Sequence, residues 1–111
     1  MELVVDLQAG TVDLTDPDDF AHFAVRVSGP AEPAGGADRL AAVLADTEVG
    51  RLEGGADAFI LPDAVRSLAA GRAGEGWEDG FAGMCRYAAT KGWVADDGGI
   101  QAHVEWPPAG P

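Results

Sequence analysis

The sequence is short of several residue types, and each shortage limits what the protein can be. Cysteine occurs once, at Cys85, so the chain cannot form a disulfide within itself, which is typical of a reducing compartment. No apolar run approaches the length of a membrane-spanning helix. The first residues lack the basic start and apolar run of a signal peptide, because Glu2 and Asp6 interrupt them. We therefore predict a cytoplasmic protein.

Basic residues are also scarce. The chain has 7 Lys and Arg residues against 19 Asp and Glu, which gives a formal net charge of −12 at pH 7. Such a surface repels phosphates and anionic lipids, so we expect neither a nucleic acid nor a membrane as partner. It favours a basic protein partner or metal cations. A coding bias, a salt-adapted surface or a need for solubility would produce the same charge, and these alternatives stay open.

Large side chains make up little of the chain. Alanine supplies 21 of the 111 residues and glycine another 16, so a third of the chain adds almost no volume to a core. We expect one α+β domain over residues 1–106, followed by a flexible proline-rich tail over residues 107–111.

Most of the large aromatic side chains lie in residues 75–106. Apolar residues first recur there at the helical spacing of three and four, and Gly92 follows as a plausible C-cap. Residues 96–99 then have the composition of a turn. From residue 100 the period changes to two, which predicts a half-buried strand. The helical stripe comprises Trp77, Phe81, Met84, Cys85 and Ala88, and the strand buries Ile100, Ala102, Val104 and Trp106.

The remaining segments predict further strands and short helices. Residues 2–8 and 11–15 read as a hairpin with a two-residue loop, which would set Leu7 opposite Val12. Residues 16–23 read as a short helix that passes into a strand near Ala24. Residues 28–36 form a loop, 38–45 and 62–70 form helices, and 47–53 pairs with 57–61. This succession favours an antiparallel sheet with helices packed on one face.

Three glycines, Gly76, Gly80 and Gly83, lie on one side of the predicted helix. We interpret them as sites where another backbone approaches closely, because they follow no strand and form no phosphate-binding pattern. Short metal-ligand spacings are absent as well, so we expect no cofactor and no metal.

The two histidines offer the one candidate site. On the predicted strand, His103 shares a polar face with Glu105, and His22 shares a side with Arg26 in either a helix or a strand. If the two segments are neighbours, His22, Arg26, His103 and Glu105 meet on the uncovered sheet face. Such a cluster is suited to acid–base catalysis or anion binding. The alternative is two separate, solvated histidines. The same face carries Glu2 and Asp6, so a metal site of two histidines and two carboxylates is a further alternative, which no short ligand spacing supports.

Two tryptophans and the cysteine have simpler interpretations. Trp106 ends a strand before prolines, and it is either part of the core or, together with Trp93, an interface residue. Cys85 lies on the apolar stripe, where an inert, buried thiol is expected.

Three functions remain after these observations. The first is a small acidic accessory or interaction protein without a catalytic motif, which self-associates as a homo-oligomer or binds a protein partner. The second is a small enzyme or a domain for a small-molecule ligand that uses the histidine cluster. The third is an inhibitor or immunity-type protein whose acidity mimics nucleic acid. The absence of any catalytic motif favours the first.

Overall fold

A computed structural model describes residues 1–28, 36–53, 56–71 and 74–106. The predicted loop at 28–36, apart from its two end residues, and the predicted tail at 107–111 lie outside these residues. Three helices are present in the described chain: α1 (Gly36–Asp46), α2 (Pro62–Ala69) and α3 (Trp77–Thr90). Six strands accompany them: β1 (Glu2–Asp6), β2 (Thr11–Thr15), β3 (Ala24–Ser28), β4 (Gly50–Glu53), β5 (Asp57–Ile60) and β6 (Ile100–Glu105).

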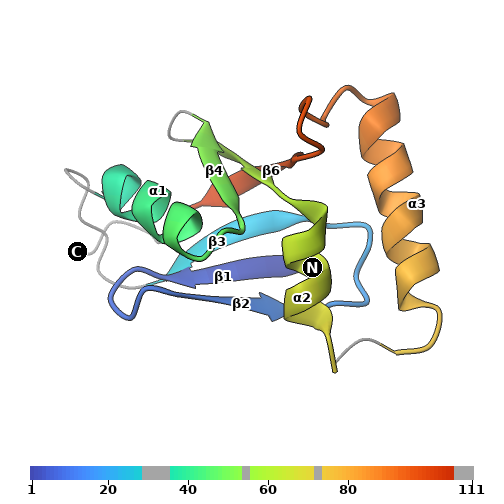
Figure 1. Ribbon diagram of the computed structural model, residues 1–111, viewed down its shortest axis with the longest axis horizontal. Coiled ribbons are helices and arrows are strands. Elements are labelled where there is room, and N and C mark those ends of the chain that lie inside the picture. Colours follow the sequence, from blue (N-terminus) through green and yellow to red (C-terminus); the bar gives the residue numbers. More distant parts are fainter. Residues whose placement is uncertain (29–35, 54–55, 72–73, 107–111) are drawn as a thin grey trace.

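The strands form one sheet in the order β2-β1-β3-β6-β5-β4, which curls into a half-barrel (Figure 1). The α+β class is confirmed, but the prediction of an antiparallel sheet was wrong. β3 runs parallel to both β1 and β6, while the other pairs are antiparallel. The alternation of apolar residues determines which face of a strand is buried, and it carries no information about the direction of the neighbouring strand.

The first hairpin forms with a different register from the predicted one. Val5 lies opposite Val12, and Leu3 lies opposite Leu14. The loop is longer than predicted because the Asp6 carboxylate accepts hydrogen bonds from the backbone N–H groups of residues 8 and 9. The register moves by two residues, so the same side chains still face the core.

The two faces of the sheet differ sharply in polarity. One face is apolar and packs against α1 and α2, which lie over the sheet in Figure 1. The other face carries charged and polar residues from neighbouring strands. Fully buried residues on the apolar side include Leu3, Leu14, Val25, Ile60 and, from the helices, Leu40 and Val65.

The third helix packs beside the sheet, against the chain between β2 and β3 (Figure 1). Its first residue, Trp77, stacks on Phe81 with ring centroids 4.9 Å apart. The indole Nε1 of Trp77 donates a hydrogen bond of 2.7 Å to the carbonyl oxygen of Pro17. The hydrogen bond to Pro17 holds residues 16–23 against α3.

Residues 16–23 do not form the predicted helix. Asp16 has a φ of +48°, and the segment continues through turns into β3. The α-amino group of Met1 opposes a helix here, because it donates hydrogen bonds to the carbonyl oxygens of Asp19 and His22. Carbonyls directed at this amino group are not available for helical hydrogen bonds.

The predicted close backbone approach at the α3 glycines was also wrong. Gly80 faces the ring of Phe20 rather than a backbone, and a Cβ at Gly83 would contact the side chain of Arg86. The other predicted elements form. They are the helix at 38–45 (α1), the second hairpin (β4 and β5), the helix after Pro62 (α2), and the helix and strand before and after Gly92 (α3 and β6).

Candidate functional site

The polar face of the sheet brings together residues from four strands. Register places Glu2, Ala24, His103 and Asp57 in one row across β1, β3, β6 and β5. Arg26 and Glu105 are partners in the next row. The side chain of Ala24 is small, and His22, two residues before the start of β3, lies across the same region of the face.

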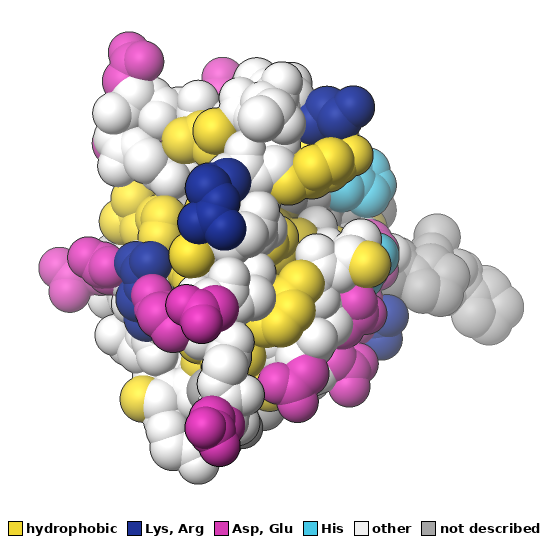
Figure 2. All heavy atoms as spheres, turned by 90° about the vertical axis from the view of Figure 1, so that its right-hand side faces the viewer, with side chains coloured by type: hydrophobic (Ala, Val, Ile, Leu, Met, Phe, Trp, Pro, Cys, Tyr) yellow, Lys and Arg dark blue, Asp and Glu magenta, His cyan; other side chains and the backbone are white. Residues whose placement is uncertain are grey.

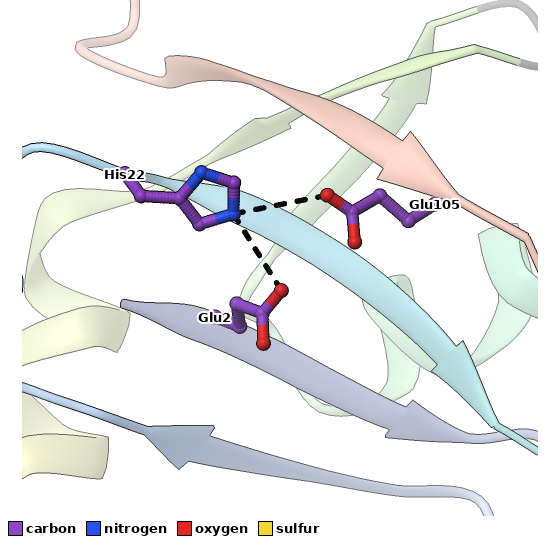
Figure 3. A group of neighbouring side chains, drawn as sticks. All are labelled: Glu2, His22 and Glu105. Atoms are coloured by element: carbon purple, nitrogen blue, oxygen red, sulfur yellow. Dashed lines mark ion pairs between the residues drawn. The ribbon is translucent and has the colours of Figure 1, made fainter.

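Four of these side chains form a compact polar cluster. His22 Nε2 lies 3.5 Å from Glu2 Oε2 and 3.7 Å from Glu105 Oε1, as Figure 3 shows. The guanidinium of Arg26 donates a hydrogen bond of 2.9 Å to Glu2 and lies 3.8 Å from the second oxygen of Glu105. We call Glu2, His22, Arg26 and Glu105 the charged quartet.

The structure thus brings three of the four sequence-predicted site residues into contact. The fourth, His103, lies on the same face and extends toward β5, where its Nδ1 lies 3.9 Å from a carboxylate oxygen of Asp57. The face therefore holds two imidazole–carboxylate groups side by side. Sequence reasoning placed Glu2 on this face but gave Asp57 no role, because the proximity of Asp57 to His103 depends on the β5–β6 register.

A groove of about 580 Å³ opens between residues 20–24, α3 and β6. Both aromatic and polar side chains line it. The aromatic lining consists of Phe20, Phe23, Tyr87 and Trp93, and the polar lining of His22, Gln101, His103 and Glu105. Figure 2 faces this end of the molecule and shows exposed hydrophobic side chains next to a histidine. The groove thus contains both histidines and one end of the charged quartet.

Two aromatic side chains of the groove are exposed to solvent. Tyr87 is 56% exposed and Trp93 is 43% exposed, and their rings meet edge to face with centroids 6.0 Å apart. The ammonium group of Lys91 lies 5.5 Å from the centroid of the Tyr87 ring. This aromatic wall is therefore already in contact with one cation of the chain itself.

Carboxylates gather around the polar residues that line the groove. Glu105 lines the groove directly, while Glu2 and Asp57 contact the two histidines that line it. Among the described ion pairs, Arg26 is paired with two of these carboxylates, those of Glu2 and Glu105. With neutral imidazoles, the carboxylates outnumber the cations around these residues.

The other residues singled out from the sequence lie away from the groove. The ring of Trp106 lies against the start of α1, close enough that a Cβ on Gly36 would be 3.2 Å from it. Cys85 is half-buried in α3, and burial raises the pKa of its thiol above the ordinary value. An interface role for Trp93 and Trp106 stays a prediction.

Comparison with known proteins identifies no relative: no family model, curated protein or solved structure matches the chain. Within the described residues, none of the helices has both the length and the apolar character needed to cross a membrane.

Proposed function

We propose that the protein is an interaction module without catalytic activity, which binds a basic segment of a partner protein in the groove. The observation that carries this proposal is the composition of the groove. Exposed aromatic side chains line it together with the carboxylate of Glu105 and two histidines that contact further carboxylates, in a chain with a net charge of −12.

Aromatic rings and carboxylates together favour a cationic side chain over a neutral or acidic one. An ammonium or guanidinium group placed over an exposed ring gains about 0.5–1 kcal/mol, and about 2 kcal/mol where water is excluded. Tyr87 and Trp93 offer such rings, and Glu105 offers a counter-charge in the same groove. The long-range field of the acidic surface would also accelerate the approach of a basic partner.

The exposure of the groove to solvent favours a peptide segment over a small molecule held in a closed pocket. Its aromatic wall is open to solvent, with Tyr87 more than half exposed. Small-molecule sites enclose most of the ligand surface, whereas an open groove of this kind suits a chain that enters and leaves at its ends.

An enzyme that uses the two histidines is the second candidate, because both imidazoles line the groove. The described lining residues include no serine, threonine, cysteine or lysine that would serve as a nucleophile. His103 is largely exposed, so the groove offers no dry environment for proton transfer. These features favour a binding function over catalysis.

The test is a comparison of three heptapeptides that differ in charge and carry three lysines, three glutamates or three norleucines. Binding of fluorescently labelled peptides is followed by anisotropy at low and moderate salt. We expect the lysine peptide to bind most tightly and to lose affinity with salt. Equal binding of the glutamate peptide would contradict the proposal.

Two matched variants localise the binding. Trp93→Ala removes part of the groove wall and should weaken the lysine peptide about tenfold, as expected for one partly desolvated cation–π contact. Trp106→Ala removes an exposed tryptophan that contacts the start of α1 and does not line the groove, so it should leave the affinity unchanged. Equal losses in both variants would show that the peptide binds elsewhere.

A further inference from the structure

We propose that Glu2, His22 and Glu105 form a binding site for a divalent transition-metal ion, with Zn²⁺ as the preferred ion. The inference does not rest on peptide binding, although His22 and Glu105 also line the groove. It rests on the convergence of three donor atoms from β1, the chain before β3, and β6 (Figure 3).

The donor atoms are spaced as ligands of one ion would be. His22 Nε2, a Glu2 oxygen and a Glu105 oxygen all lie within 4.8 Å of one another. Nε2 is 3.5 Å from the Glu2 oxygen and 3.7 Å from the Glu105 oxygen. Ligands about 2.1 Å from a tetrahedral ion are separated by about 3.4 Å, so small side-chain movements complete the site.

The chemistry of the donors selects the class of ion. One imidazole nitrogen and two carboxylates suit Zn²⁺, which accepts nitrogen and oxygen ligands and would keep a water molecule in its fourth position. Mg²⁺ prefers oxygen ligands in an octahedral arrangement, and a site with an imidazole donor does not favour it. The two negative charges would balance the charge of the ion.

The site is partly preorganised by the fold. Only 13% of the Glu2 side chain is exposed, so its carboxylate has little freedom. The backbone carbonyl of His22 accepts a hydrogen bond of 2.8 Å from the Met1 amino group, which holds His22 beside β1. The His22 side chain itself is 51% exposed, which leaves an open path for an ion.

Arg26 is the cation that competes for this position. Its guanidinium bonds to the Glu2 oxygen that also faces His22. The Arg26 side chain is 55% exposed, so it can turn into solvent when an ion arrives. Surface ion pairs of this kind are weak and easily exchanged. Removing the guanidinium should therefore tighten metal binding, a result that a merely structural ion pair does not predict.

The experiment is a calorimetric titration of the folded protein with Zn²⁺ in excess Mg²⁺, which occupies the scattered carboxylates of the acidic surface. We expect one Zn²⁺ per chain. His22→Gln and Glu105→Gln should each weaken binding at least tenfold, and Arg26→Gln should tighten it several-fold. His103→Gln is the matched control and should change nothing, because that imidazole faces Asp57. Binding that is insensitive to His22→Gln, or that depends equally on His103, would overturn the proposal.

A second measurement needs no variant. Substoichiometric Mn²⁺ should broaden the amide NMR signals of residues 2, 22 and 105 before those of α1. Uniform broadening over all acidic residues would mean that divalent ions bind the surface without a site, and would also overturn the proposal.

Discussion

Gly80 of α3 faces the ring of Phe20, and a Cβ at this position would lie 2.7 Å from the Cζ atom of that ring. Phe20 lines the groove and also contacts Trp77, with ring centroids 6.3 Å apart. The absence of a side chain at Gly80 therefore allows α3 to approach the chain before β3, and this approach forms one end of the groove.

The first prediction compares two glycines of the same helix. Gly83→Ala adds a methyl group whose nearest neighbour is an Arg86 nitrogen at 3.7 Å, so it should stabilise the protein by about 1 kcal/mol through helix propensity. Gly80→Ala gains the same propensity but displaces the Phe20 ring. We expect Gly80→Ala to be less stable than Gly83→Ala in urea unfolding. Equal stability of the two variants would show that Phe20 does not pack as described.

The second prediction concerns the aromatic core under α3. Phe81 is fully buried and stacks on Trp77, so Phe81→Ala should lower the free energy of unfolding by about 3–5 kcal/mol. Tyr87→Ala, on the exposed side of the same helix, should cost about 1 kcal/mol or less. Thermal and urea unfolding measure both. An unchanged melting temperature for Phe81→Ala would place the core elsewhere.

The third prediction concerns the reactivity of the single cysteine. Burial raises the pKa of the Cys85 thiol, so at pH 7–8 a smaller fraction is thiolate than in an exposed cysteine. Disulfide exchange with an aromatic thiol reagent should be slow in the folded protein. Unfolding in urea should restore the ordinary pKa and accelerate the reaction. A fast reaction of the native protein would identify Cys85 as an accessible thiolate and contradict the expectation of an inert thiol.

The fourth prediction is self-association at moderate salt. β2 and β4 end the described sheet, and strand edges of this kind can pair with a second chain. The net charge of −12 opposes association, and salt weakens this repulsion. Light scattering should report the mass of one chain, 11.4 kDa, at low salt and a larger mass at moderate salt. A mass of one chain under both conditions would argue against a homo-oligomer.

Local patterns predicted the elements of this fold better than its connections. The helical stripe of α3 and the alternation in β6 follow from spacing alone, because burial of one face requires that spacing. The direction of β3 does not follow from alternation, and it depends on how residues 16–23 pass the start of β1. Hydrogen bonds from the Met1 amino group to carbonyls about twenty residues away help to fix that path.

The candidate site, like the fold, could be predicted only in part from the sequence. His22, Arg26 and Glu105 were grouped on the assumption that their segments are neighbours, and the β3–β6 pairing brings them together. Glu2 joins them through the parallel β1–β3 register, and Asp57 draws His103 toward β5. The aromatic wall was not predicted, because Phe20, Tyr87 and Trp93 come from three segments that meet only in the folded chain.

The most direct test of the central claim, that the groove binds a cationic segment, is an NMR titration of the three indole N–H signals with the lysine heptapeptide. Trp93 lines the groove, Trp77 is buried with its Nε1 bonded to Pro17, and Trp106 lies against α1. Replacement of each tryptophan by phenylalanine assigns the signals. We predict that the Trp93 signal moves progressively with added peptide while the other two stay in place. An unmoved Trp93 signal, or a larger shift at Trp106, would contradict the proposed function.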